Sequence, residues 1–448
     1  MNRPGRPLAL PLFIAALFAS PVQAADLMQL YRDAQTNDPT YAAARATLEA
    51  SQEKAPQARA GLLPSLTLSG NTVWNDNEYR YKKQPAFNGD PQYNSNGYQL
   101  TLSQPLFRWQ NWVGYDQAKL QVAQAEANFA QARQDLILRV AQAYFDVLYA
   151  GENLKAVQAN KESIVQQLEL AKKSFEVGSA TITDTHEAQA RYDLAVAQEI
   201  AAESDLEIRR RSLQAILGKE AGALAELRKS AELERPQPDD MNAWVAAAEK
   251  DSLAVQIQQA NADIAAREVD RQRAGHYPTV DLVANYGHAK TLASTTLGPI
   301  ENDYRNAGIQ LSIPLFSGGL TTSRQREASA NRAAAQSVLE GTRRSAALSA
   351  RQQYLGVANG LAQVKALQAA LLSSQSALAS NKLGYEVGVR INIDVLNAEN
   401  QVYVTRRDLA RATLDTLLAQ LRLKAATGGL GDDDVARINA LLDPSTGQ

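Results

Sequence analysis

A short glycine-bearing segment that interrupts a long helical pattern occurs twice in this chain. Residues 175–178 are Phe-Glu-Val-Gly and residues 385–388 are Tyr-Glu-Val-Gly, at a constant offset of 210 residues. The flanking stretches are rich in alanine, leucine and glutamine and predict helices. Glycine adopts positive φ without a steric penalty, so each segment predicts the tip of a helical hairpin. Two such tips indicate a chain built as two tandem copies of one unit.

The second tip separates helical patterns over residues 321–383 and 394–426. We expect Gly384 and Gly388 to let the chain leave the first helix, because both can adopt the left-handed conformation. Asp394 is expected to be the N-cap or a first-turn residue of the second helix. The predicted tips are residues 175–184 and 384–394.

The N-terminus has the pattern of a cleaved secretory signal, residues 1–24. Arg3 and Arg6 form a basic start, an apolar stretch covers residues 8–19, and small residues precede Ala25. The alternative, a transmembrane anchor, would need a longer apolar run. A secreted precursor therefore fits the sequence better than an anchored protein.

Charge and cysteine content exclude several classes of function. Removal of residues 1–24 changes the formal net charge from −2 to −4, and a mildly acidic chain does not indicate a nucleic-acid partner. The chain has no cysteine, so disulfide bonds, thiolate metal sites and a lipidated cysteine at the mature N-terminus are excluded.

Two stretches change from the helical period to strict alternation. Leu66, Leu68 and Trp74 alternate with Ser, Thr and Asn, and the alternation resumes after a polar stretch at 75–96. This pattern predicts a β-hairpin at about residues 63–107. The second half repeats it at about residues 278–316, around an expected polar loop at 288–303.

Such strands, with one apolar face, fit either a soluble sheet packed on a helix or a segment of a membrane β-barrel. A polar opposite face and aromatic residues near the strand ends favour the barrel. These aromatic residues are Trp74, Tyr79, Tyr81, Tyr98, Phe107, Trp109 and Trp112. Four strands cannot close a barrel, and open edges are not tolerated in lipid, so a barrel requires an oligomer that pools strands.

The helical stretches are too long for compact domains. Residues 111–173 would form a helix on the order of 95 Å long, with a break near Gly151 allowed by the pattern. Aromatic residues are only 6% of the chain, which favours an elongated coiled coil over several globular cores. The expected divisions are residues 1–24, 25–217, an irregular segment 218–240, residues 241–427 and a C-terminal segment 428–448.

The tip motifs resemble the TolC family of outer-membrane channel proteins. They are Tyr-x-Val-Gly-x-Arg-x-x-x-Asp-Val-Leu at 385–396 and Val-Gly-x-x-x-Ile-Thr-Asp at 177–184. The resemblance implies a mixed α and transmembrane β fold, in which a homotrimeric twelve-stranded β-barrel is continued by an α-helical coiled-coil tunnel. It also implies the cell outer membrane of a Gram-negative bacterium, with the tunnel extending into the periplasm, and a passive exit duct.

The resemblance assigns roles to the residues of the tips. It implies a periplasmic gate latch in which Arg390 and Tyr385 bond to Asp184 and Thr183 of the neighbouring hairpin. The Asp394 carboxylates, one per protomer, would form a constriction ring that attracts cations. The alternative is that these residues are ordinary helix caps and surface side chains.

One position departs from the family pattern. Asn397 stands where some members carry a second acidic ring, so we expect weaker cation block than in a doubly acidic mouth. The implied docking surface for a periplasmic adaptor is at both tips. Its residues are Gly178, Ser179, Ala180, Thr181, Gly388, Val389, Arg390 and Ile391.

The implied partners are outer-membrane lipid, a periplasmic adaptor and an inner-membrane pump of the ABC or RND type. Type I protein secretion and drug efflux both fit, although the missing lipid anchor favours the branch that serves secretion. Two other classes remain open, a periplasmic adaptor and a structural coiled-coil protein without a pore. An enzyme is not expected, because His186, His276 and His288 lie far apart and no phosphate-binding loop is present. No cofactor or metal site is expected beyond cation block at Asp394.

Overall fold

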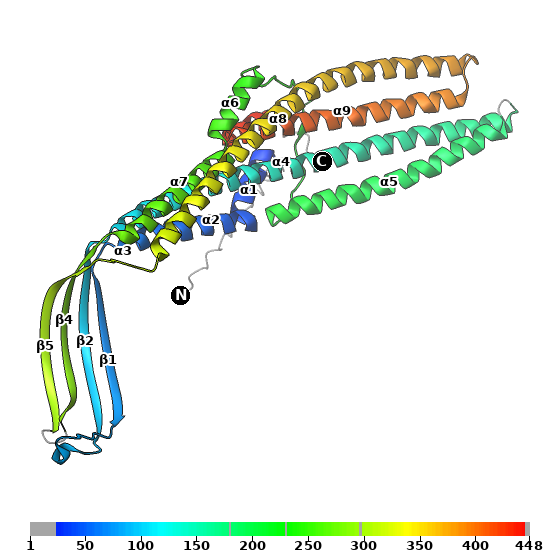
Figure 1. The fold of residues 1–448 in the computed structure, drawn as a ribbon. Coiled ribbons are helices and arrows are strands. Elements are labelled where there is room, and N and C mark those ends of the chain that lie inside the picture. The colour runs from blue at the N-terminus through cyan, green and yellow to red at the C-terminus, as the bar shows by residue number, and fades with distance from the viewer. Residues whose placement is uncertain (1–23, 179–180, 229–230, 295–297, 444–448) are drawn as a thin grey trace, which may run out of the picture.

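The computed structural model describes residues 24–178, 181–228, 231–294 and 298–443. The molecule is elongated, with a four-stranded sheet at one end and the tips of two helical hairpins at the other (Figure 1). Residues 1–23 of the expected signal, and Ser179 and Ala180 of the first tip, lie outside the described residues.

The sheet contains β1 (Ser65–Asp76), β2 (Gln92–Phe107), β4 (Thr279–Ser294) and β5 (Gly298–Ser312), and every pair is antiparallel. Their order is β1-β2-β4-β5, so the central pairing joins a strand of the first half to one of the second. Among the residues that the structure describes, β1 and β5 each have a single neighbouring strand.

The predicted loop at 288–303 is wrong, because most of it belongs to β4 and β5. His288 lies opposite Asp303 and Lys290 opposite Glu301 in the ladder, and both pairs make cross-strand contacts. Hydrogen-bonded and oppositely charged cross-strand pairs stabilise strands as apolar pairs do. The strands therefore continue where the apolar alternation of the sequence ends. The polar stretch at 75–96 is likewise shortened, because β2 begins at Gln92.

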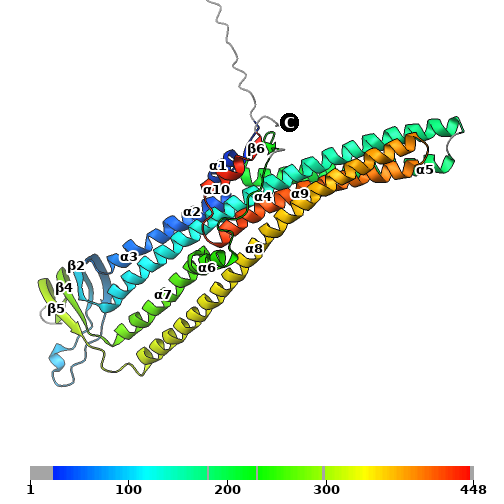
Figure 2. The ribbon, with the colours of Figure 1, turned by 90° about the horizontal axis from the view of Figure 1, so that it is seen from above.

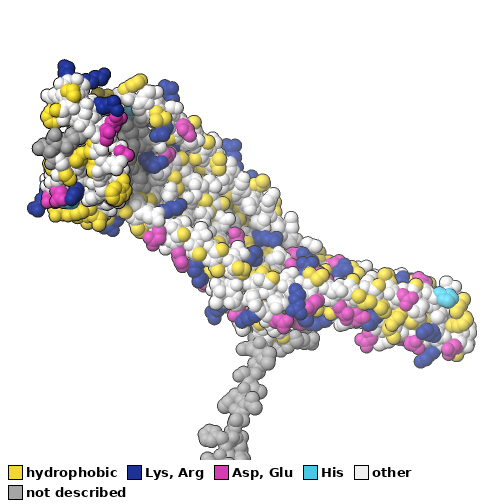
Figure 3. Space-filling model, turned by 90° about the horizontal axis from the view of Figure 1, so that it is seen from below, with side chains coloured by type: hydrophobic (Ala, Val, Ile, Leu, Met, Phe, Trp, Pro, Cys, Tyr) yellow, Lys and Arg dark blue, Asp and Glu magenta, His cyan; other side chains and the backbone are white. Residues whose placement is uncertain are grey.

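The two faces of the sheet differ in chemistry. The strand register places apolar side chains of all four strands on one face near the helices; they are Leu66, Leu68, Leu100, Leu102, Leu282, Ile309 and Leu311. On the other face, Asn285 Oδ1 accepts hydrogen bonds from Gln99 and Thr101, and Asn285 donates to Asn306. Figure 3 shows hydrophobic side chains gathered over the sheet end, whereas charges of both signs are scattered along the helices. None of the helices described is apolar over a stretch long enough to cross a bilayer.

Two very long helices carry the chain from the sheet to the tips. α4 (Trp109–Glu176) and α8 (Leu320–Glu386) have 68 and 67 residues, so each extends for roughly 100 Å. α4 is continuous through Gly151. The shorter α5 (Ile182–Leu217) and α9 (Asn392–Ala426) return alongside the distal halves of α4 and α8 (Figure 1).

Shorter helices lie beside the proximal halves of α4 and α8 (Figure 2). The helical stretch before β1 is divided at Asp38 and again at Glu53, and the corresponding stretch of the second half is divided at Ser252. The segments are α1 (Leu27–Asn37), α2 (Pro39–Gln52), α3 (Lys54–Ala60), α6 (Met241–Asp251) and α7 (Leu253–Arg273), which the 3-10 turn η2 (Ala274–His276) follows. Another 3-10 turn, η1 (Pro85–Phe87), lies in the connection between β1 and β2.

The largest core lies midway along the molecule, where the first and the last described segments meet α4. α10 (Asp432–Asn439) packs near α1, and β6 (Leu442–Asp443) pairs with β3 (Glu226–Leu227) of the segment at 218–240. Tyr144 of α4 donates a 2.5 Å hydrogen bond to the carbonyl of Ala225. Core residues include Leu27, Leu30, Tyr31, Leu136, Ile137, Leu213, Leu217, Leu417, Leu421 and Leu442.

Asp38 ties the N-terminal helices to α4. Its side chain is 3% exposed, accepts the N–H of Tyr41 at 2.7 Å as the N-cap of α2, and pairs with both terminal nitrogens of Arg139 at 3.0 Å. Burial opposes its ionisation, but the hydrogen bonds from Arg139 and Tyr41 outweigh burial, so the pKa of Asp38 lies below its usual value.

We expect Asp38→Asn to lower the free energy of unfolding by about 1–3 kcal/mol at pH 7, because the amide keeps the cap but loses the charged pair. A lowered native pKa gives stability that is present above the unfolded value of 3.8 and is lost as pH falls through the native value. Thermal unfolding of detergent-purified protein should therefore show the gap between the two proteins closing below about pH 4. An equal gap at pH 7 and pH 3 would contradict this account.

Candidate functional site at the hairpin tips

The first tip closes with a reciprocal helix cap. Gly178 has φ of +74°, and its N–H donates to the carbonyl of Phe175. Thr181 is the N-cap of α5, and its backbone N–H and hydroxyl donate to Asp184 Oδ2 at 3.0 and 2.9 Å. The Asp184 carboxylate is therefore engaged by its own helix start, while Thr183 beside it is exposed.

The second tip closes differently from the prediction made for Gly384. Gly388 has φ of +80°, but Gly384 lies inside α8, which continues to Glu386. The Gly384 carbonyl accepts the N–H groups of Val389 and Arg390 at 2.9 and 3.1 Å. A Cβ at Gly384 would lie 2.7 Å from Arg390 Cγ. Glycine is required there so that the chain can fold back over the helix end, and not for positive φ.

Asp394 lies in the first turn of α9, as predicted, and pairs with Arg390 of the same segment. Arg390 Nη1 lies 3.5 Å from Asp394 Oδ2, and the two side chains are 58% and 34% exposed. An exposed pair of this kind contributes only about 0–1 kcal/mol. Within the part of this single chain that the structure describes, no hydrogen bond or ion pair joins Arg390 to Asp184, or Tyr385 to Thr183.

Three of the predicted residues share one surface hollow. Arg390, Asp394 and Asn397 line a cavity of 380 Å³ between α8 and α9. The other lining residues are Ser374, Ala377, Asn381, Ala398 and Gln401. Asp394 and Asn397, one turn apart on α9, thus lie beside Arg390 in this hollow, whereas Tyr385, Asp184 and Thr183 are not among its lining residues.

Contacts between the two hairpins involve residues that the sequence analysis missed. Arg191 of α5 donates from Nη2 to Asn397 Oδ1 at 3.0 Å, and Tyr403 of α9 donates to the carbonyl of Ala159 at 3.2 Å. Leu396, 3% exposed, packs against α4 and α5. A lone arginine on an exposed helix is indistinguishable in sequence from an ordinary surface charge, so nothing indicated a partner 206 residues away.

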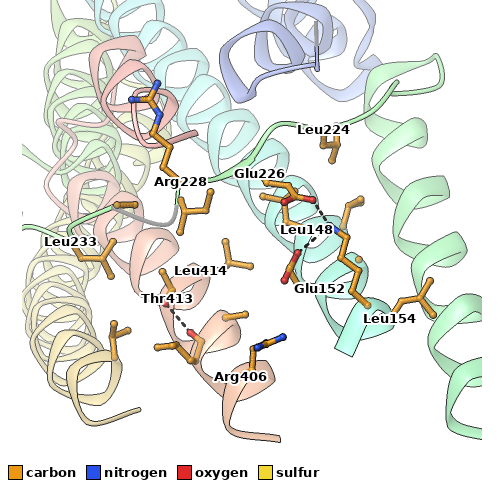
Figure 4. A pocket seen from close by; sticks show the side chains of 18 of the residues that line it. Leu148, Glu152, Leu154, Leu224, Glu226, Arg228, Leu233, Arg406, Thr413 and Leu414 are labelled. Carbon is orange, nitrogen blue, oxygen red and sulfur yellow. Dashed lines mark hydrogen bonds and ion pairs between the residues drawn. The ribbon is translucent and has the colours of Figure 1, made fainter. Parts of the chain in front are cut away.

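A larger cavity of 1940 Å³ lies between the hairpins under the segment that follows α5 (Figure 4). Lys155 of α4 bridges Glu152 and Glu226 on its wall, and Arg406 of α9 extends into it (Figure 4). Among the described residues, no group of His, Cys, Asp and Glu is arranged to hold a metal ion.

Comparisons with known proteins agree over almost the whole chain. The family model for outer membrane efflux proteins matches residues 30–219 and 244–429. The outer membrane protein TolC of Vibrio cholerae is 32% identical over 439 residues, which are 97% of this chain and 98% of that protein. The alkaline protease secretion protein AprF of Pseudomonas aeruginosa is 32% identical over 421 residues, covering 92% of this chain and 86% of its own length.

Solved structures share the fold at lower identity. The outer membrane protein VceC of Vibrio cholerae has a TM-score of 0.76 at 22% identity, covering 90% of this chain and 96% of its own. The open state of the MtrE outer membrane channel of Neisseria gonorrhoeae has a TM-score of 0.75 at 20% identity, covering 91% and 90%.

We expect Thr181→Ala to destabilise the start of α5 by about 1 kcal/mol, because the Asp184 N–H loses its acceptor and the carboxylate loses the hydroxyl. Faster amide hydrogen exchange over residues 182–186 would report this loss. Thr183→Ala is the matched control, since Thr183 takes no part in the capping box. Equal exchange in the two variants would contradict the cap.

Proposed function

The chain belongs to the outer membrane efflux protein family, and from this premise we propose that it works as a homotrimeric duct with a gate at its hairpin tips. It is an outer-membrane protein and an exit duct for export, as the family match and the names of its relatives support. One observation carries the proposal. The molecule has a sheet with an apolar face and two open edges at one end, and two helical hairpin tips at the other end.

The open edges of the sheet support the trimer. β1 and β5 each leave one row of backbone N–H and C=O groups without a neighbour in the chain. Hydrocarbon offers these groups no hydrogen-bond partner, so a membrane sheet must be closed. Joining β5 of one copy to β1 of the next makes a twelve-stranded barrel from three copies, and an even strand number is usual for such barrels.

The same threefold arrangement would join the helices into a tunnel. Each chain contributes α4 with α5 and α8 with α9, so three chains supply six hairpins to one ring. The chain itself is proposed to be a tandem repeat, residues 25–217 and 241–427, because the family model matches two separate stretches of similar length.

The tips are proposed to form the periplasmic gate. Arg390 makes only a weak, exposed pair with Asp394, so it can exchange that partner for Asp184 and Thr183 of a neighbouring hairpin. Tyr385 would add a hydrogen bond to the same latch. The Asp394 carboxylates of three chains would meet at the constriction and attract cations.

Opening is proposed to require partners, since the family works with efflux or secretion machinery. A periplasmic adaptor would dock at both tips, and an inner-membrane pump of the ABC or RND type would supply the energy. Relatives named for protease secretion support export of proteins, and relatives named for efflux and fusaric acid resistance support export of small molecules. The family match disfavours the adaptor and the poreless coiled coil.

Planar-bilayer recording of the purified oligomer tests the gate. We expect Arg390→Ser and Tyr385→Phe to raise the closed-state conductance, because each removes a bond of the latch. Asp394→Ala should weaken block by trivalent cations, because it removes the ring carboxylates. Thr183→Ala should raise the conductance less than Arg390→Ser, since it removes a neutral partner only.

Three results would overturn these assignments. Conductance unchanged in both Arg390→Ser and Tyr385→Phe would exclude the latch. Cation block undiminished in Asp394→Ala would exclude the ring. A mass corresponding to one chain in detergent would exclude the trimer itself.

A further inference from the structure

We infer that Arg191 and Asn397 fasten the two helical hairpins of one chain to each other beside the tips, and that separation of this contact accompanies opening. The inference rests on the proposed gate and adds to it a positioning pair within a single chain. Arg191 Nη2 donates to Asn397 Oδ1 at 3.0 Å, from α5 to α9. Asn397, expected to be a weakened ring residue, therefore acts through a partner on the neighbouring helix.

The contact between the hairpins has a polar part, which is this hydrogen bond, and an apolar part. Leu396, adjacent to Asn397 on α9, packs between Ile164 of α4 and Ala195 of α5. Arg191 and Ala195 are one helical turn apart on α5, so the polar and the apolar contact fall on the same face of that helix. Glu187 lies 3.9 Å from the guanidinium on the preceding turn and helps to orient it.

A second hydrogen bond continues the same stripe of α9. The hydroxyl of Tyr403, two turns beyond Leu396, donates to the carbonyl of Ala159 in α4 at 3.2 Å. Burial, and secondly the charge of Glu399, raise the pKa of Tyr403, so its hydroxyl stays protonated and remains a donor. Contacts at Leu396, Asn397 and Tyr403 thus follow one another along the seam between the hairpins.

Near the tips, the bonds within each hairpin differ in kind from the bonds between the hairpins. Lys382 Nζ of α8 lies 2.8 Å from Oε1 of Glu399 in α9, and this glutamate is only 2% exposed. Lys161 of α4 pairs with Glu199 of α5, whose side chain is 15% exposed. Separating the partners of a buried carboxylate is far more unfavourable than breaking one partly exposed hydrogen bond.

This difference defines which surfaces separate. Near the tips each hairpin is held by an ion pair, whereas the seam between the hairpins contains hydrogen bonds and the small apolar cluster around Leu396. Farther from the tips, the Arg411–Asp146 ion pair at 3.9 Å and the central core also join α9 to α4, so we infer that separation is confined to the tip end. Movement of α8 and α9 away from α4 and α5 would break the Arg191–Asn397 contact and leave both ion pairs intact. The seam is therefore the reversible element of the tip.

Substitution of Asn397 by aspartate distinguishes a pore-facing ring residue from a residue that joins the hairpins, because the two roles predict different effects. In a pore-facing ring, Asn397→Asp adds negative charge and strengthens cation block. If Asn397 instead joins the two hairpins, the same substitution replaces a neutral acceptor with a carboxylate opposite Arg191. This strengthens the bond between the hairpins and holds the tip closed.

The experiment is a double-mutant cycle on the full-length oligomer in planar bilayers, with the ratio of open to closed dwell time as readout. We expect Arg191→Gln and Asn397→Ala each to raise that ratio about two- to fivefold, and the double variant to raise it no further than the larger single effect. Asn397→Asp should lower the ratio, and Arg191→Gln should abolish this lowering. Arg210→Gln is the control, an exposed arginine of α5 for which the described residues provide no ion pair or hydrogen bond.

The experiment distinguishes a wrong inference about Arg191 and Asn397 from a wrong proposal of the gate. If Arg390→Ser raises the ratio while the Arg191 and Asn397 variants do not, only the fastening is excluded. If Asn397→Asp strengthens trivalent-cation block equally with and without Arg191, the residue faces the pore and the inference is wrong. If no variant, Arg390→Ser included, changes the ratio, the gate itself is wrong. Thermal unfolding of each variant shows whether a changed ratio comes from misfolding.

Discussion

The backbone hydrogen bonds of an open sheet are the constraint on which the rest of this molecule depends. Four antiparallel strands pair all their inner edges but leave β1 and β5 with one free edge each. In water such an edge is tolerable, and in hydrocarbon it is not. The proposed closure of three sheets into one barrel would also fix where the long helices start, because α4 begins directly after β2 and α8 follows β5 after the short connection 313–319. The geometry of the helical part would then follow from the pairing of strands.

Along the helices, the interactions that hold neighbouring helices together change from apolar packing at mid-length to single polar contacts near the tips. A large apolar core gathers the first and the last described segments around the middle of α4, and Asp38 and Arg139 join the first helices to it. Towards the tips the core thins to small clusters, and single polar contacts such as Arg191 with Asn397 take over. Dense packing resists rearrangement, whereas isolated hydrogen bonds exchange readily with other partners. The molecule is thus most rigid at mid-length and most adaptable at the tips.

Much of this arrangement could be predicted from local patterns, and the misses have identifiable causes. Alternation of Leu66 and Leu68 with polar residues located the first strand, and Gly388 located a tip. The loop expected around His288 was wrong because hydrogen-bonded and charged cross-strand pairs replaced apolar pairs in the ladder. Gly384 was misassigned because a close approach, like positive φ, also demands glycine. The contact of Arg191 with Asn397 joins residues far apart in sequence, and no local pattern encodes such a contact.

The uninterrupted length of α4 has a mechanical consequence. From Tyr144 in the central core to the helix end at Glu176 the helix extends for roughly 48 Å without a break. A rotation of about 10° at the core would therefore displace the tip by about 8 Å, more than the width of a hydrated ion. The helix acts as a lever arm, so slight repacking around Tyr144 would be amplified into a large movement at the far end.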